Sequence, residues 1–225
     1  MKRKILILIT AVATASLVAV GGTLAWMTDK AEVSNVVTMG NVNIKLEEPV
    51  FSSSSMSDYI DGAYVKKGFI FPGDSFLKDP TITNIGHNPC YIRAKVELVL
   101  KRDGEVIANN AVQLSDGTTR VITAEDFFSP NDGWTKSSQD GYYYFDSIVP
   151  TTGNGSSVAL FKTAKDGNTI HVPTEWGNEI VGISFQLNVN AEAVQSEHFT
   201  PSTEVVGGKT VIRNWNGITP ETYPG

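Results

Sequence analysis

Residues 181–193 read VGISFQLNVNAEA, and every odd-numbered position in this stretch is apolar while every even-numbered position is glycine or polar. Successive side chains of a β-strand point to opposite faces of the sheet, so this alternation predicts a strand with one buried face and one wet face. Antiparallel sheets commonly bury one face in this way. The stretch therefore predicts an antiparallel β-fold with residues 181–193 as a core strand.

The same alternation recurs along the chain, whereas helical periodicity is rare. Residues 41–46 and 91–100 repeat it most clearly. Further strands are predicted at residues 64–71, 76–84, 105–108, 142–148, 157–162, 169–172 and 209–213. Among several Asp-Gly pairs, Asp103-Gly104 lies between two such runs and predicts a tight hairpin, because this pair tolerates the positive φ angles of hairpin turns.

Together these elements predict an all-β chain: one jelly-roll-like antiparallel β-sandwich over residues 39–225, with long connections and one or two short helices, after an N-terminal signal helix. A short helix is expected at residues 123–128, since Thr123 can cap it. The serine-rich residues 51–61 predict a mobile loop. The one cysteine, Cys90, shares an apolar strand face, which favours a small core residue over a reactive nucleophile.

The N-terminus predicts export. A basic start at residues 2–4 precedes an apolar run at residues 5–20 and then small residues up to Ala25, as in a secretory signal peptide. We expect cleavage between Ala25 and Trp26, which leaves 15 basic and 24 acidic residues and a net charge of −9. So acidic a surface disfavours a nucleic-acid partner. The alternative is that the run is retained as a membrane anchor.

Three stretches together resemble the TasA/camelysin family of exported bacterial proteins. The first is GGTLAWMTDKAEVSNVVTMGNVNIKL at residues 21–46, which is similar to the family's signal end and first strand. The second comprises FPGD at residues 71–74, ITNIG at residues 82–86 and YIR at residues 91–93. The third is the core strand up to Gln195. The resemblance covers residues 1–100 and 180–198, and it is greatest to the clostridial branch of BsaA-type matrix proteins.

This resemblance implies a secreted jelly-roll subunit of extracellular fibres in a biofilm matrix, located at the cell surface and in the matrix. It implies cleavage by a signal peptidase of the SipW type, a head-to-tail homopolymer, and a minor anchoring or accessory subunit as a further partner. In that family the mature N-terminal segment completes the sheet of the next subunit, which makes residues 26–38 the donor segment here.

The chemistry of this segment agrees with a donor strand. An exposed sheet edge accepts an added strand through backbone hydrogen bonds, and side-chain pockets set its register. Apolar side chains for such pockets are those of Trp26, Met27, Ala31, Val33 and Val36. A head-to-tail contact of this kind grows as a filament. The alternative is that this N-terminus packs on its own domain or stays free.

Two other functions compete with the fibre subunit. A camelysin-like metallopeptidase needs converging ligands, but the three histidines, His87, His171 and His198, are far apart in sequence and form no HExxH motif. A monomeric adhesin would bind sugars through aromatic side chains, for which the candidates are Trp134, Trp176, Trp215 and Tyr142–Tyr144. We predict a non-catalytic protein without metal or cofactor.

Overall fold

The structure is a computed structural model that describes residues 37–39, 42–54, 57–60, 63–66, 68–114, 116–218 and 220. The expected signal helix and the cleavage site between Ala25 and Trp26 lie outside the described residues. So do the expected donor side chains of Trp26, Met27, Ala31, Val33 and Val36.

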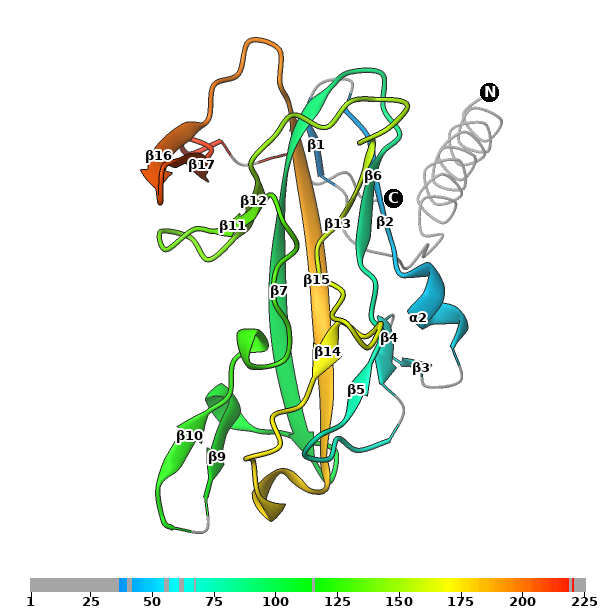
Figure 1. Cartoon of the computed structure of the whole chain (residues 1–225), viewed down its shortest axis with the longest axis vertical. Helices are drawn as coiled ribbons and strands as arrows, with labels where there is room; N and C mark the ends of the chain where they lie inside the picture. The colour runs from blue at the N-terminus through cyan, green and yellow to red at the C-terminus, as the bar shows by residue number, and fades with distance from the viewer. Residues whose placement is uncertain are drawn as a thin grey trace, which may run out of the picture. The chain divides into compact units, whose positions relative to one another are not determined.

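One sheet is built around two long strands, β7 (Cys90–Arg102) and β15 (Ile183–Gln195), which pair antiparallel over 13 residues (Figure 1). Beyond β7 lie β12 (Tyr143–Phe145) and β11 (Trp134–Lys136), while β8 (Glu105–Val106) also pairs with β7. Beyond β15 lies β1 (Val37–Met39), the one parallel neighbour among these strands.

The opposite layer consists of shorter strands. One group contains β2 (Ile44–Glu47), β6 (Thr81–Asn84) and β13 (Ser157–Ala159), and another contains β5 (Ser75–Phe76) and β14 (Ile170–His171). A main hydrophobic core joins both layers, because Ile44 and Ile82 on one side and Ile92 and Leu187 on the other belong to a single buried cluster. The predicted all-β sandwich is confirmed.

The remaining elements decorate the sandwich. One is the helix α2 (Pro49–Ser53). Three are two-stranded pairs: β3 (Ser57–Ile60) with β4 (Ala63–Lys66), β9 (Ala111–Gln113) with β10 (Thr119–Val121), and β16 (Ser202–Val206) with β17 (Lys209–Asn214). The others are the 3-10 turns Ala108–Asn110, Ala124–Asp126 and Asn178–Ile180. A second buried cluster, containing Tyr144, Val194, Ile212 and Trp215, joins β12, β15 and the C-terminal hairpin.

Local sequence signals were accurate at turns and caps. The hairpin at Asp103-Gly104 is confirmed, with φ angles of 53° and 85° at the two residues and pairing between β7 and β8. The expected short helix is a 3-10 turn whose Thr123 and Asp126 form a capping box. Several strands are shorter than predicted; residues 76–84, for example, contain the end of β5 and all of β6, separated by residues 77–80.

The loop predicted for residues 51–61 is wrong where the structure describes it. Residues 49–53 form α2 and residues 57–60 form β3. The reason is tertiary: the Asp79 carboxylate accepts hydrogen bonds from the backbone N–H groups of Val50 and Phe51 at 3.0 and 2.9 Å, which satisfies the start of the helix. Phe51 is 1 % exposed, and its ring stacks on that of Phe76 with 5.9 Å between the ring centroids. Burial of this ring thus orders a segment whose serine-rich sequence predicts a loop.

Candidate functional site

The two edges of strand β15 differ in how they are paired. Along one edge β15 pairs with β7 from Ile183, opposite Arg102, to Gln195, opposite Cys90. Along the other edge it pairs with β1 only, in parallel, with Val37 opposite Glu192 and Met39 opposite Val194. β1 lies beside one end of β15 in Figure 1. The chain thus enters its own sheet at one end of an otherwise open edge.

Over residues 184–191, no strand in the described part of the chain pairs with β15 on this second edge. The far end of the edge is closed at Ile183, whose carbonyl oxygen accepts a hydrogen bond from Ile70 N–H at 3.1 Å. β4 packs against β15 without forming a ladder with it. A strand edge of this kind presents backbone N–H and C=O groups in the geometry that another strand needs.

The core-facing side chains beside this open edge are incompletely covered. Leu187 and Ala191 are buried, but Val189 between them is only partly buried. On β7, Val96 lies opposite Val189 and is partly buried too, as is Leu98. These residues pack against the main core without being enclosed by it. The middle of the long sheet therefore has partly buried apolar side chains near backbone that no strand among the described residues pairs.

The donor segment predicted at residues 26–38 reaches the structure at its last two residues. Val37 and Thr38 belong to β1 and pair with the chain's own β15, opposite Glu192 and Ala193. The segment that remains available for a neighbour is thus residues 26–36, all outside the described residues. The alternation pattern does not predict β1 itself, because a strand of three residues is too short for its alternation to be recognised.

The side chain of Arg93 links β7 to β15 on the outer face of the sheet. Arg93 lies opposite Glu192 in the β7–β15 register, and its Nη2 is 2.6 Å from the Glu192 carboxylate. The guanidinium stacks between the rings of Tyr142 at 4.0 Å and Trp215 at 4.3 Å, and it donates a hydrogen bond to the Tyr144 hydroxyl at 3.1 Å. Burial is the largest cause that raises the pKa of Tyr144, so this phenol stays protonated and donates to Asp140.

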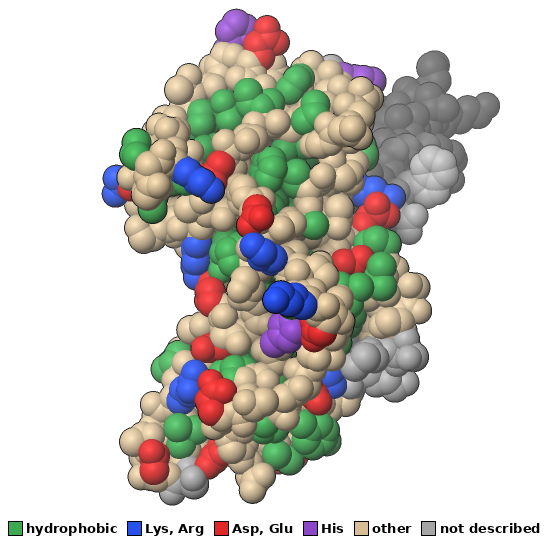
Figure 2. Space-filling view, viewed as in Figure 1, with side chains coloured by type: hydrophobic (Ala, Val, Ile, Leu, Met, Phe, Trp, Pro, Cys, Tyr) green, Lys and Arg blue, Asp and Glu red, His purple; other side chains and the backbone are tan. Residues whose placement is uncertain are grey.

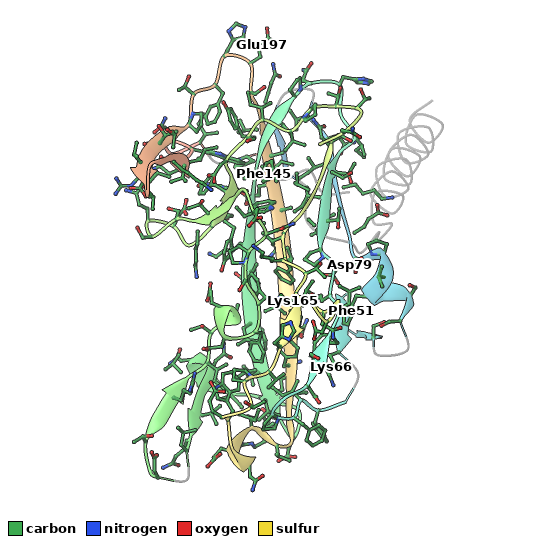
Figure 3. All side chains as sticks on the ribbon, viewed as in Figure 1. Phe51, Lys66, Asp79, Phe145, Lys165 and Glu197 are labelled. Atoms are coloured by element: carbon green, nitrogen blue, oxygen red, sulfur yellow. The ribbon has the colours of Figure 1, made fainter. Side chains whose placement is uncertain are left out.

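A second buried ion pair lies in the opposite layer. The Lys78 ammonium, 4 % exposed, is 2.7 Å from the Glu48 carboxylate and 4.6 Å from the centre of the Phe51 ring. Figure 3 shows the neighbouring Asp79 beside Phe51 and α2. Burial raises the pKa of Glu48 and lowers the pKa of Lys78, in each case against the opposing effect of the partner's charge. This pair joins the end of β2 to the segment between β5 and β6.

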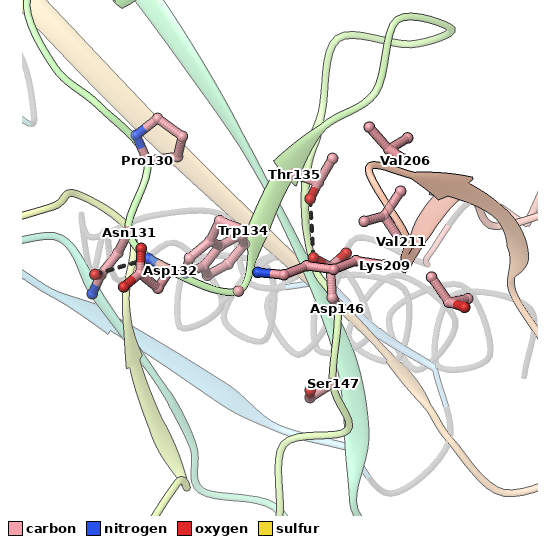
Figure 4. Close-up of a pocket in the computed structure, with 12 residues that line it drawn as sticks. Pro130, Asn131, Asp132, Trp134, Thr135, Asp146, Ser147, Val206, Lys209 and Val211 are labelled. Atoms are coloured by element: carbon pink, nitrogen blue, oxygen red, sulfur yellow. Dashed lines mark hydrogen bonds between the residues drawn. The ribbon is translucent and has the colours of Figure 1, made fainter.

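A cleft lies between β11, the residues that follow β12 and the C-terminal hairpin (Figure 4). Asp146 in its wall accepts hydrogen bonds from the Thr135 hydroxyl at 2.9 Å and from Ile212 N–H at 3.2 Å. Burial raises the pKa of this carboxyl. The Trp134 indole lines the cleft, yet its Nε1–H donates to the Ala159 carbonyl at 3.0 Å and only 6 % of the residue is exposed. The Asp146 carboxylate and the Trp134 indole N–H thus serve internal contacts.

Most of the aromatic side chains considered as candidates for sugar binding are core side chains. Those buried to 6 % exposure or less are Trp134, Trp176, Trp215, Tyr143 and Tyr144. Tyr142 is half-buried and stacks on Arg93. A sugar platform needs an accessible ring face, and these faces are occupied by protein.

The three histidines lie on separate segments: His87 between β6 and β7, His171 in β14 and His198 after β15. Within the described residues, no three His, Cys, Asp or Glu side chains are grouped as a metal site requires. Cys90 is fully buried, and burial raises the pKa of its thiol to about 12, as expected for a core residue. No helix among the described residues is long and apolar enough to cross a membrane.

Comparisons with known proteins leave the family open. No protein-family model, no curated protein and no solved structure matches this chain. The likeness to the TasA/camelysin family therefore rests on the residues quoted above. The feature of the structure that bears on function is the open edge of β15.

Proposed function

We propose that this chain is a secreted structural subunit that polymerises head to tail into extracellular fibres of a biofilm matrix. The signal segment is removed between Ala25 and Trp26 by a signal peptidase of the SipW type, and the freed N-terminal segment of one subunit completes a sheet of the next. The partners are further copies of the same chain and a minor anchoring or accessory subunit. The protein is non-catalytic and acts at the cell surface and in the matrix.

The observation that carries this proposal is the open edge of β15 next to β1. A donor strand needs an acceptor edge with unpaired backbone and adjacent apolar surface, and residues 184–191 supply the first while Val189, Val96 and Leu98 supply the second. It also needs to be joined to its own subunit, and residues 26–36 directly precede β1 in the chain. Export before cleavage keeps polymerisation outside the cell.

The distribution of charge on the surface is compatible with a homopolymer at physiological ionic strength. Figure 2 shows acidic and basic side chains interspersed over the visible face. The mature charge of −9 nevertheless makes subunits repel one another. The Debye length is about 8 Å at physiological ionic strength, so repulsion between exposed charges farther apart than this is largely screened. Assembly by strand addition, which depends on backbone hydrogen bonds and apolar contacts, is then favourable.

The test compares a chain that starts at Trp26 with one that starts at Val37, at matched concentration, by light scattering and negative-stain electron microscopy. We expect filaments from the first and a folded monomer from the second, since Val42 is the first of the described residues in the main core. Equal filament formation by both chains would refute the donor role of residues 26–36. Circular dichroism of the shorter chain serves as the control, because it shows whether that chain is folded.

A further inference from the structure

The C-terminal hairpin is anchored to the sandwich by only one of its two strands. β17 packs against β12, and its Val211 and Ile212 are buried. Ile212 belongs to the second buried cluster together with Trp215. β16, in contrast, has no buried residue, and four of its five residues are exposed. Figure 1 shows β16 at the periphery of the molecule. The hairpin therefore presents β16 outward on a base that β17 holds in place.

The outer edge of β16 has backbone groups without a described partner. Within the described residues β16 pairs with β17 alone. Along an antiparallel ladder, hydrogen-bonded pairs alternate with non-hydrogen-bonded pairs, whose N–H and C=O groups point outward. Ile212, opposite Thr203, is in a pair of the second kind, because its N–H donates to the Asp146 carboxylate at 3.2 Å. Thr203, and Val205 two residues further along, thus direct their backbone groups away from β17.

The side chains of β16 do not block this edge. Natural edge strands are commonly protected by lysine or proline, but residues 202–206 read STEVV. The one charge, that of Glu204, is balanced by Arg213 of β17 at 3.5 Å. Val205 is 72 % exposed. The irregularity of the β16–β17 ladder lies at the base of the hairpin. The outer part of β16 is therefore a regular strand edge that another strand can join.

A second β16 fits this edge in one antiparallel register. With Glu204 opposite Glu204 of a second copy, Thr203 of each copy lies opposite Val205 of the other, so the outward groups of both copies pair with each other. A shift of two residues in one direction sets Val205 opposite Pro201, which has no N–H. A shift in the other direction sets Thr203 opposite Gly207, which lies in the turn with a φ of 58°. The register centred on Glu204 is therefore favoured.

The side chains suit this register as well. On one face Val205 lies across from Thr203 of the second copy and diagonal to its Val205, and cross-strand pairs of β-branched residues stabilise a ladder. On the other face the two Glu204 carboxylates meet, each with its own Arg213 beside it. Two negative and two positive charges are thus grouped together. A strand with an unbalanced charge would lack this complementarity, which identifies a second copy of the chain as the partner.

We propose that the outer edge of β16 is a self-association site, at which β16 of a second copy pairs antiparallel and joins the two hairpins into one sheet. The contact is isologous, because both copies contribute the same residues, so it closes at two copies and builds no filament by itself. In fibres of the proposed function it joins neighbouring filaments side by side. Many such contacts along two filaments act together, so each one can be weak.

Disulfide trapping at the twofold centre tests this site. The full-length chain carries Glu204→Cys, is recovered after export and is oxidised gently. The two copies of position 204 form a non-hydrogen-bonded pair, whose Cα atoms lie about 4.5 Å apart. Disulfides span roughly 4.4–6.8 Å between Cα atoms. We expect a disulfide-linked homodimer on a non-reducing gel. Cys90 is fully buried, so it contributes little background.

The matched control is Thr210→Cys, at an exposed position on β17 of the same hairpin. In the proposed sheet three strand spacings, or about 14 Å, separate the two copies of position 210. This separation is beyond the reach of a disulfide. We expect at least a tenfold lower yield of dimer from Thr210→Cys than from Glu204→Cys. Equal yields would overturn the site.

Loss of one outward N–H tests the backbone contact. Val205→Pro, added to the Glu204→Cys chain, removes an N–H that the β16–β17 ladder does not use, and edge strands tolerate proline at such a position. We expect at least a fivefold lower yield of dimer with an unchanged circular dichroism spectrum, whereas Val205→Thr keeps the N–H and the yield. Val205→Lys, which adds a charge to the edge, should lower the yield even if the proline variant misfolds. An undiminished yield in Val205→Lys, or in a folded Val205→Pro chain, would contradict the inference.

Electron microscopy separates this inference from the proposed function. We expect Val205→Pro to leave filaments intact and to abolish their side-by-side contacts. A chain that forms no filaments but gives the Glu204→Cys dimer would refute the fibre function and leave the β16 site standing. Loss of the filaments themselves in a folded Val205→Pro chain would place β16 in the head-to-tail contact and overturn its isologous role.

Discussion

The two edges of β15 belong to the same strand and carry the same side-chain alternation, yet one is closed and the other open. On the β7 side all 13 residues are paired, and Arg93 and Glu192 add a buried ion pair across the two strands. On the β1 side only residues 192–194 are paired within the described residues. The closed edge holds the fold together, and we propose that the open edge links the subunits.

This comparison separates stability from assembly. A change at the closed edge should lower the free energy of unfolding without a specific effect on fibres, whereas a change at the open edge should do the reverse. The predictions that follow are ordered by their expected effect on the free energy of unfolding.

Loss of Arg93 should have the largest effect. In Arg93→Ala the Glu192 carboxylate, 18 % exposed, loses its cationic partner and keeps only the hydrogen bond from the Tyr142 hydroxyl, and the rings of Tyr142 and Trp215 lose the guanidinium between them. We expect a loss of about 4 kcal/mol, as for a buried ion pair broken on one side. Urea unfolding followed by circular dichroism measures it. The control is Arg213→Ala, whose partner Glu204 is 41 % exposed, with an expected loss below about 1 kcal/mol. Similar losses for the two variants would contradict the role assigned to Arg93.

Variants of the Lys78–Glu48 pair test the contribution of an ion pair in the opposite layer to the free energy of unfolding. In Glu48→Ala the Lys78 ammonium loses both the carboxylate 2.7 Å away and the side chain that packs beside it, so we expect a loss of about 3 kcal/mol. Replacing both residues, by Glu48→Leu with Lys78→Met, should return stability to within about 1 kcal/mol of the natural chain, because two desolvated charges are removed together. A double variant as unstable as the single one would argue against this account. Fibre yield per folded molecule should not change in either variant.

The open edge should respond in the opposite way. Val189→Asp places a charge at a partly buried position, for which we expect a loss of only about 1 kcal/mol in the monomer. The critical concentration for filament formation should rise by about tenfold or more, which corresponds to about 1.4 kcal/mol per contact. Sedimentation of filaments at a series of concentrations measures it. The control is Asn188→Asp, on the polar face, where an acceptor for the Gln186 amide is retained and both quantities should hardly change.

The smallest expected effect is the pH dependence that Glu48 gives to the free energy of unfolding. Its pKa in the folded chain is raised above the ordinary value of 4.5, chiefly by burial, so the folded state binds this proton more tightly than the unfolded state does. The contribution to stability is therefore complete below pH 4.5 and falls as the pH rises through the folded pKa. Unfolding free energies between about pH 4 and pH 7 should show this decline in the natural chain and not in Glu48→Gln. A rise attributable to Glu48 over that range would contradict the sign.

Much of the fold follows from the sequence because its signals are local. The alternation at residues 181–193 places Ile183, Phe185 and Leu187 on the core face, as the structure confirms. The positive φ angles at Asp103 and Gly104 were expected from the residue types alone. The burial of Cys90 likewise follows from its position on an apolar strand face.

Other features required tertiary contacts that no local pattern encodes. The helix α2 depends on Asp79, a residue 28 positions beyond Phe51 in the chain, whose carboxylate binds the first turn. The aromatic residues taken as candidates for sugar binding are buried because strands distant in sequence cover them; the C-terminal hairpin, for example, shares a cluster with Tyr144. Strand lengths were overestimated where Pro80 and its neighbours interrupt the run between β5 and β6.

The sequence by itself determined which residues alternate, where the chain turns and which face of each long strand is apolar, since these properties depend on neighbours along the chain. Only the tertiary structure decided which strand lies beside which, that β1 joins β15 in parallel, and that residues 184–191 have no described partner on one edge. The physical reason is that a β-strand carries hydrogen-bonding groups on both edges whatever its side chains are. Whether an edge is filled depends on segments far away in sequence, as the parallel pairing of β1 with one end of β15 shows.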